Sequence, residues 1–475
     1  MRIRFGSAIL LLAAAYAAAQ TTPAAVTPPV YTPVRWTEDY SYLKDPSKKA
    51  DLFDPVKYIA LGSNDVYLSV GGQVRERYEF FNNNNFGAGP QDDNGYYLTR
   101  LLLHADLHVT DFFRFFVQGK SAMIDGREGG PRPVDSDELA LEQGFVDFRI
   151  PVSTGEKDSL IFRVGRQDLI YGAQRLISPL DWANTRRNFQ GVKAVASVGK
   201  ATLDLFWVNP VTIENEEPNI GNDDAGFWGA YGTLATPDLI AAGDGSKFEL
   251  YFLGLNRVAN AGTPVDSDTY TIGARFSSKP KPWDLDVEGD YQFGPFGSLD
   301  TCAWSFATEG GYTFENIQLK PRPFIGFDIA SGDNDPTDGS RNTFNQLFPL
   351  GHAYFGYIDA IGRQNIIDLH PGIEMSLLEK QQYAQKLTLR GEYHLFWRQS
   401  TDDAVYNAAG GVLRADLGSD SADIGSEIDL LLNWQINRHV AMQFGYSHFF
   451  AGSFLEDTGA HEDIDFLYTT FQYTF

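Results

Sequence analysis

The chain has 475 residues and a formal net charge of -24, with 62 acidic and 38 basic side chains. Such an acidic chain is unsuited to binding nucleic acid, because phosphate contacts need a basic surface. Its single cysteine, Cys302, excludes an internal disulfide framework and a cysteine-built metal site. Beyond the first 20 residues no apolar run approaches the ~18 residues that a membrane-spanning helix needs, and 35 Phe, 23 Tyr and 46 Gly favour β-structure.

The first residues have the pattern of a secretory signal peptide, which we expect over residues 1–19. Arg2 and Arg4 precede an apolar stretch over 9–15, and three alanines at 17–19 provide a cleavage site. Residues 20–62 contain several prolines and are only weakly periodic, so we expect a periplasmic lead-in segment there. The part of it from 40 to 59 could dock on the mouth of the domain that follows.

From Val66 onward, apolar and polar residues alternate with a period of two. In residues 73–80, for example, Val74 and Tyr78 lie on one face while Arg75 and Arg77 lie on the other. The same alternation recurs at 100–109, 270–277, 283–293, 387–398, 427–436 and 466–475. One strand of this kind could belong to a soluble sandwich. Its repetition behind a signal peptide favours strands with one face toward lipid and one toward water.

We therefore predict an all-β fold, a transmembrane antiparallel β-barrel of about 18 strands over residues 63–475. Barrels of this class have long external loops and short periplasmic turns, which must alternate along the chain. A weak strand at 225–234 is needed to keep them in phase. Short turns are expected near Thr110, Gly199, Lys279 and Asn437. Long loops are expected at 82–95, 122–138, 170–189, 209–224, 258–266, 331–362, 399–422 and 451–462.

Residues 163–193 depart from the alternation and combine basic residues with Asp168 and Asp181. Arginine keeps its charge and presents a fork of donors to carboxylates, so this composition suits a constriction for an anionic, hydrogen-bonding solute. A solvated loop with ordinary ion pairs would have the same composition.

The segment 165–193, GRQDLIYGAQRLISPLDWANTRRNFQGVK, resembles a signature of the alginate-export family of outer-membrane β-barrels. Blocks at 332–365 and 392–454, and the stretches DPVKYIAL and GGQVRERYE near the start, are similar to the same family. The resemblance implies an 18-stranded barrel in the cell outer membrane whose basic lumen attracts polyanionic polysaccharide. The lumen residues that it implies are Arg75, Arg77, Arg100, Arg163, Arg166, Arg175, Arg186, Arg187, Lys193, Arg390 and Arg398.

The expected solute is an alginate-like polyuronate or a related polar solute. Parity places Arg75, Arg77, Arg100, Arg390 and Arg398 inward and leaves the orientation of residues 163–193 open. However, residues 283–293 point four carboxylates inward, which would repel a uronate. Opposed acidic and basic walls also suit a general or uptake porin for small sugars or organic acids, which is the alternative. Expected partners are membrane lipid, lipopolysaccharide, the solute and a periplasmic export partner.

Residues 333–339, DNDPTDG, imitate the start of a calcium loop through Asp333, Asp335 and Asp338. Asp338 stands where the turn glycine belongs and Phe344 where a bidentate glutamate is needed, so a plain acidic turn is the simpler interpretation. No metal and no other cofactor are therefore expected. No nucleophile elbow or zinc motif accompanies the scattered histidines, which makes a barrel-borne envelope enzyme the least favoured alternative.

Overall fold

The computed structural model describes residues 31–62, 66–152, 158–214, 218–237, 244–260, 265–279, 281–380 and 385–475. The expected signal peptide at 1–19 lies outside these ranges. Within them, no helix combines the length and the apolar character needed to cross a membrane.

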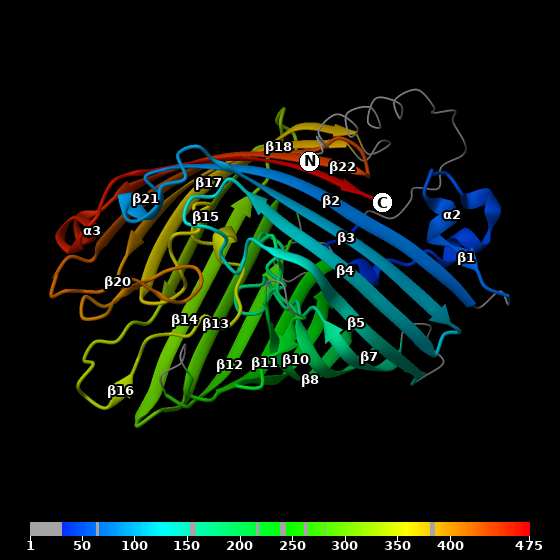
Figure 1. Ribbon diagram of the computed structural model, residues 1–475, viewed down its shortest axis with the longest axis horizontal. Helices are drawn as coiled ribbons and strands as arrows, with labels where there is room; N and C mark the ends of the chain where they lie inside the picture. Colours follow the sequence, from blue (N-terminus) through cyan, green and yellow to red (C-terminus); the bar gives the residue numbers. More distant parts are fainter. Residues whose placement is uncertain are drawn as a thin grey trace.

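Eighteen antiparallel strands form a closed barrel, which confirms the predicted fold (Figure 1). Closure is direct, because β2 pairs with β23 from Gln73↔Thr474 to Asn82↔Asp465. The strands are β2 (Val66–Asn82), β3 (Tyr96–Val109), β4 (Phe113–Asp125), β5 (Asp137–Pro151), β6 (Ser159–Gln167), β7 (Phe189–Val198), β8 (Ala201–Thr212), β10 (Ala225–Pro237), β11 (Asp244–Arg257), β12 (Ser267–Ser278), β13 (Trp283–Phe296), β14 (Leu299–Tyr312), β15 (Arg322–Ala330), β17 (Ile366–Lys380), β18 (Gln385–Trp397), β21 (Asp423–Gln435), β22 (Val440–Ala451) and β23 (Ile464–Thr474).

The two ends of the barrel differ in their connections. At the turn end, short turns follow β3, β7, β12 and β21, as predicted. The N-terminal segment (31–62) also packs there. At the loop end lie the long connections, and the weak strand that keeps the two kinds in phase is present as β10. The remaining short elements are η3 (Arg35–Thr37), η4 (Ser41–Lys44), η5 (Pro46–Lys48), α2 (Asp54–Lys57), β1 (Ile59–Ala60), η6 (Asn84–Gly87), β9 (Ile220–Gly221), β16 (Ser340–Arg341), η7 (Gly351–Ala353), β19 (Val405–Tyr406), β20 (Val412–Arg414) and α3 (Ser453–Thr458).

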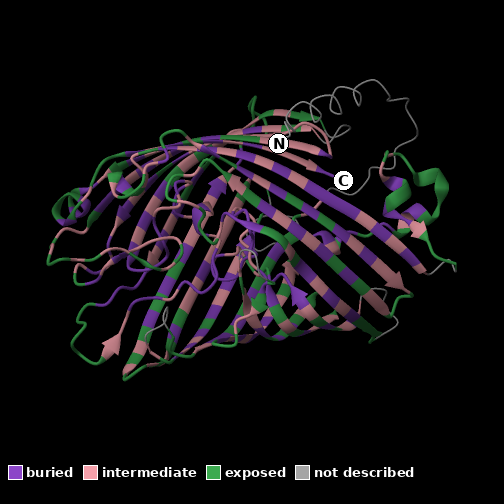
Figure 2. Ribbon diagram, in the orientation of Figure 1, coloured by how far each residue is buried: buried purple, intermediate pink, exposed green. Residues whose placement is uncertain are grey.

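Burial alternates along the strands, as the banding in Figure 2 shows. On β3, Leu101 and Leu103 are 41% and 59% exposed, whereas the neighbouring Arg100 and Leu102 are 0% and 6% exposed. The outer face thus carries the apolar side chains and the inner face the buried polar ones. This inversion of the soluble pattern is what a barrel in hydrocarbon requires.

The main hydrophobic core lies inside the barrel. Two long connections at the loop end, loop A (168–188) and loop B (331–365), contribute Leu176, Ile177 and Phe348 to a buried cluster that also contains Phe189 and Phe227 of the wall. The ring of Phe348 lies 5.1 Å from Phe189 and 4.9 Å from Phe227, centroid to centroid. The lumen at the loop end is therefore packed with side chains.

Loops A and B are joined through their backbones. Ser178 N donates to Phe348 O at 2.9 Å, and Phe348 N donates to Leu176 O at 2.8 Å. Loop C (398–422) is joined to loop B, because the side-chain amide of Asn365 donates to the carbonyl of Ser400 at 2.9 Å. Satisfying these backbone groups removes the main cost of burying loop segments inside a barrel.

The positions of Leu103 on β3 and Leu139 on β5 predict how the stability cost of an added charge depends on its depth in the membrane. Leu103→Arg places a guanidinium in mid-strand on the lipid face and should lower the free energy of unfolding by about 2–4 kcal/mol. Leu139→Arg, at the loop end of β5 where the leucine is 89% exposed, should cost about 0–1 kcal/mol. Urea titration of protein folded into lipid vesicles would measure both. Equal costs at the two sites would contradict the assigned depths.

Candidate functional site

Three arginines of the barrel wall hold loop A by its backbone. Arg75 donates to the carbonyl of Asp181 at 2.7 Å, and Arg77 donates to that of Trp182 at 2.7 Å. Arg100 donates to the carbonyl of residue 183 at 3.1 Å and to Oδ1 of Asp181 at 3.0 Å. All three arginines are at most 5% exposed. They face inward, in agreement with their predicted parity, and they supply the donors that these buried carbonyls need.

The opposite wall holds loop A through carboxylates. Arg175 donates to Asp286 at 2.7 Å and to Glu288 at 2.9 Å, both on β13. Arg275 of β12 also bonds to Asp286. Loop A is thus anchored to a basic wall at one point and to an acidic wall at another, so it crosses the lumen.

Aromatic contacts fix the same loop next to loop B. Trp182 packs on His352 at 4.3 Å and on Tyr468 of β23 at 5.0 Å. Burial, followed by the charges of Arg77 and Arg75, lowers the pKa of His352 to about 3. The imidazole is therefore neutral at physiological pH and contributes to packing.

Other predicted basic residues pair along the barrel wall. Arg163 of β6 and Lys193 of β7 lie opposite one another and face inward, which settles their orientation. Arg163 pairs with Asp147 at 2.7 Å, and Lys193 pairs with Asp204 at 2.8 Å. Arg390 of β18 pairs with its neighbour on the same face, Glu392, at 2.6 Å.

The remaining predicted residues organise the loops. Arg186 pairs with Asp168 at 2.6 Å inside loop A, and Arg187 donates to Pro349 O of loop B at 3.2 Å. Arg166 donates to Asn219 O at 2.7 Å. Arg398 lies just beyond the end of β18, and its donors go to carbonyls of loop C, including that of Thr401 at 2.8 Å. The structure thus gathers Arg75, Arg100 and Arg186 around Asp181, with Arg77 on the neighbouring Trp182, and distributes the others.

Several basic residues with comparable roles were absent from the predicted set. Lys120 pairs with Asp137 at 2.9 Å and with Glu142 at 2.8 Å. Arg114, Arg275, Arg322 and Arg363 also pair with carboxylates. Strand parity alone could have identified Lys120, Arg275 and Arg322, because each lies on the polar side of an alternating strand.

The acidic turn at 333–339 satisfies its own backbone. Oδ1 of Asp335 accepts from Thr337 N at 3.0 Å, and Oδ1 of Asp338 accepts from Ser340 N at 2.7 Å. Asp333 accepts from Asp335 N at 3.3 Å. These are the local bonds of turn-forming aspartates.

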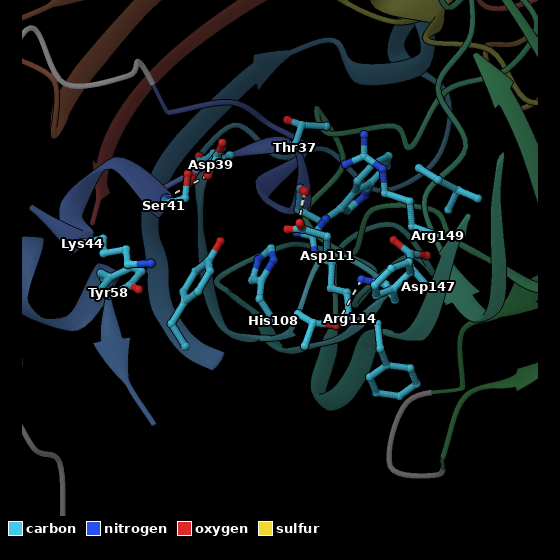
Figure 3. A pocket seen from close by; sticks show the side chains of 17 residues that line it. Thr37, Asp39, Ser41, Lys44, Tyr58, His108, Asp111, Arg114, Asp147 and Arg149 are labelled. Carbon is cyan, nitrogen blue, oxygen red and sulfur yellow. Dashed lines mark hydrogen bonds between the residues drawn. The ribbon is translucent and has the colours of Figure 1, made fainter. Parts of the chain in front are cut away.

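The N-terminal segment closes over the turn end and borders a pocket of about 390 Å³ (Figure 3). Thr37, Asp39 and Ser41 line it from the segment, and His108 and Arg149 are among the residues that line it from the barrel. The segment is attached to both ends of the strand sequence, because Arg35 donates to the carbonyls of Gly72 at 3.2 Å and of Phe475 at 2.9 Å. Within the stretch 40–59, for which docking was expected, Asp51 pairs with His439 at 2.7 Å and the ring of Phe53 lies 5.0 Å from that of Phe475.

Lys57 of α2 reaches into the barrel without a hydrogen-bond partner for Nζ among the described residues. Its ammonium lies 5.4, 5.1 and 5.9 Å from the ring centroids of Tyr31, Tyr40 and Phe475. Burial, followed by the charge of Arg35, lowers the pKa of Lys57 to about 7. Docking of the segment thus destabilises the protonated form of Lys57, which is the stable form in water.

Removing one anchor of loop A tests its tethering. Arg100→Gln deletes the ion pair with Asp181 and the bonds to carbonyls, so residues 176–187 should lose protection in hydrogen–deuterium exchange at least about fivefold. Arg149→Gln, an exposed arginine at the turn end, is the matched control and should leave this region unchanged. Unaltered protection in the Arg100 variant would mean that the remaining contacts suffice.

Docking of the N-terminal segment should depend on pH through Lys57. A lysine whose pKa falls from 10.5 to about 7 on docking binds its proton more tightly when undocked, so docking strengthens as pH rises from about 7 toward 10.5. Hydrogen-exchange protection factors for residues 31–60 should therefore increase between pH 6 and pH 9. Lys57→Met should remove most of this increase, while Lys48→Met, at an exposed lysine, should retain it. A pH-independent wild type would refute the assignment.

The alginate export family matches residues 66–466 of the chain. No curated protein matches it in sequence. Among solved structures, OccD3 (OpdP) of Pseudomonas aeruginosa is similar with a TM-score of 0.56 at 12% identity, over 86% of this chain and 91% of that one. OccK11 (OpdR) of the same organism gives 0.53 at 12%, over 86% and 96%. A BenF-like porin from Pseudomonas fluorescens Pf-5 gives 0.55 at 11%, over 86% and 99%.

The structural likenesses concern the fold, which they share over nearly their whole length. The family match spans the barrel strands from β2 into β23, and it includes loops A and B with the arginines that hold them. With its closed barrel and apolar outer face, this chain is an outer-membrane channel protein and belongs to the alginate export family.

Proposed function

We propose that the channel passes an anionic polysaccharide of the polyuronate type, or a related polar solute, along the basic wall formed by Arg75, Arg77 and Arg100. One observation carries the proposal. Loop A presents to these arginines a carboxylate, Asp181, and a row of carbonyl oxygens. Uronate units carry the same groups, so the chain itself supplies the chemistry that a passing polymer would offer.

Passage then works by exchange of partners. A solute carboxylate binds a guanidinium through two parallel hydrogen bonds, and it replaces the carbonyls of residues 181–183 as loop A moves aside. Since the arginines are bonded before and after the exchange, no buried charge is left unpaired, which keeps the barrier low. Loop B moves together with loop A because their backbones are paired. The mechanism requires no covalent step and therefore no catalytic residue.

Arg390 extends the basic path toward the turn end. Its side chain is 21% exposed, in contrast to the fully covered Arg100, so it is reachable from the lumen before any loop moves. Nearby, Arg322 is 18% exposed and pairs with Glu309 at 2.8 Å. A solute arriving from the turn end meets these accessible arginines first.

A general or uptake porin for small sugars or organic acids is the second candidate. The acidic wall supports it, because Asp286 and Glu288 on β13 oppose the arginines of β2 and β3 across loop A. Opposed walls of this kind produce a transverse field that orients small polar solutes. The loop end is also packed with buried side chains while loops A and B stay in place.

The surroundings of the barrel suggest its partners. The apolar outer face contacts membrane lipid, and we expect lipopolysaccharide around the loop end. The mouth at the turn end, with the N-terminal segment and the pocket of about 390 Å³, is the surface available to a periplasmic export partner.

Conductance in a planar bilayer tests the proposal. The wild-type channel should be anion-selective and should be blocked by micromolar oligouronate more strongly than by neutral oligosaccharide. Arg75→Glu, Arg100→Glu and Arg390→Glu should each weaken the block by at least about tenfold, since each removes a charge-assisted contact of about 1.5–3 kcal/mol. Lys281→Glu, at an exposed turn lysine, is the matched control and should keep the wild-type block.

The outcomes separate the candidates. Cation selectivity, or block by neutral sugars alone, would contradict the polyuronate path and favour the uptake porin. Weakened block together with raised conductance in the Arg100 variant would support partner exchange, because the released loop A also widens the path. If block also weakens in the control variant, the effect depends on the net charge of the protein and not on the position of the arginines.

A further inference from the structure

A cluster of histidines and carboxylates lies on the inner wall of β17, β18 and β21, away from the arginines of β2 and β3. Nδ1 of His370 lies 2.6 Å from Oδ2 of Asp368, and Nδ1 of His394 lies 3.1 Å from Oδ1 of the same carboxylate. The three residues are at most 3% exposed. One buried aspartate is thus shared by two imidazoles.

The register of the sheet brings these groups together. Leu369 pairs with Leu395, so His370 and His394 stand side by side on neighbouring strands, with ring centroids 4.8 Å apart. Asp368, His370 and His394 each offer one ligand atom, and these atoms lie within 4.8 Å of one another. Two imidazole nitrogens and a carboxylate oxygen form a donor set suited to Zn²⁺ and similar first-row ions.

The surroundings of the three residues are rich in negative charge, which a bound cation would offset. Four carboxylates, of Asp368, Glu392, Glu427 and Asp429, are at most 6% exposed, and the arginine paired with Glu392 is Arg390. Oε2 of Glu427 and Oδ2 of Asp429 have no hydrogen-bond partner within the described part of the chain. Buried carboxylate oxygens without partners are costly unless an ion or a proton compensates them.

Groups next to the three residues can orient them as metal ligands. Nε2 of His394 faces Oδ2 of Asp429 at 3.8 Å, and the hydroxyl of Ser447 donates to Asp429. A carboxylate behind a ligating imidazole fixes the orientation of its ring and raises its basicity. Asp429 and Glu427 also accept the backbone N–H groups of Tyr357 at 3.4 Å and Ile358 at 2.9 Å. The cluster therefore connects directly to loop B.

We propose that Asp368, His370 and His394 bind one divalent ion of the Zn²⁺ type, and that this ion stabilises the wall on which loop B docks. Each imidazole binds as a neutral ligand through the nitrogen that faces Asp368, so its one N–H moves to the other ring nitrogen, and only a second proton on a charged ring leaves to solvent. The positive charge of the ion offsets the surrounding carboxylates. Zn²⁺ is favoured over Ca²⁺, because calcium prefers six or more oxygen ligands and avoids nitrogen.

The test uses the full-length protein without a histidine tag, stripped of metal with a chelator and then titrated with Zn²⁺ in a calorimeter. We expect one strong site per chain. Asp368→Asn, His370→Gln and His394→Gln should each weaken it at least about tenfold, since loss of a supporting group alone has that effect. His448→Gln is the matched control, because His448 pairs with Asp465 at 2.8 Å on the outer face near the loop end.

Co²⁺ substitution adds a readout of coordination. Visible absorption bands of a low-symmetry Co²⁺ site should appear in the wild type and in the His448 variant and should vanish in the His370 and His394 variants. Retarded gel mobility on boiling, typical of folded barrels, would establish that each variant folds. Channel recordings with and without Zn²⁺ should show fewer loop-dependent openings in its presence, because loop B moves together with loop A.

Three results would overturn the inference. These are the absence of a strong Zn²⁺ site in the folded wild type, unchanged binding in the three ligand variants, and loss of binding in the His448 variant alone. In the first two cases the cluster is a hydrogen-bond network that anchors loop B through protons. In the third case the ion binds at the loop-end rim instead. None of these results depends on which solute the channel carries.

Discussion

The structure depends on the requirement that backbone placed inside a closed barrel must find hydrogen-bond partners away from bulk water. Loop A meets this requirement with guanidiniums, because one arginine donates to several carbonyls at once. Arg75 and Arg100 do so from adjacent strands, and Arg175 repeats the arrangement with carboxylates on the other side. Without these donors a segment of irregular backbone could not cross the lumen, and the barrel would have a different interior.

The same contacts join stability to transport. An arginine that only attracted solute would be solvated and mobile, whereas those of β2 and β3 are buried and bonded. Their partners are nonetheless backbone carbonyls and one aspartate, which a carboxylate-bearing solute can replace. In the proposed exchange, solute binding to these arginines competes with the binding of loop A. Under that proposal a neutral sugar competes less well than a uronate, because it has no carboxylate to offer the arginines.

Much of the fold was predictable, since alternation with a period of two identifies a strand and its inner face, and the phase of long and short connections required the strand at 225–234. Parity correctly oriented Arg75, Arg77, Arg100 and Arg390. It also placed Arg398 inward but could not show that its donors go to loop C, and it left open the orientation of Arg175, which pairs with β13. The proximity of His370 and His394 could not be predicted either. It follows from the register of β17 and β18, and the hydrophobic pattern alone does not determine which polar residues of two strands lie opposite each other.

The attachment of the N-terminal segment has a consequence for the order of assembly. Arg35 binds the carbonyl of Phe475, and Asp51 pairs with His439 at 2.7 Å, so the segment uses atoms from the last strands of the chain. Those atoms come together with β2 only after the sheet has closed on itself. A segment made first can thus settle only when the final strand is in place. Docking of residues 31–60 therefore follows completion of the barrel, and in an unfinished barrel these residues stay undocked and more open to proteolysis.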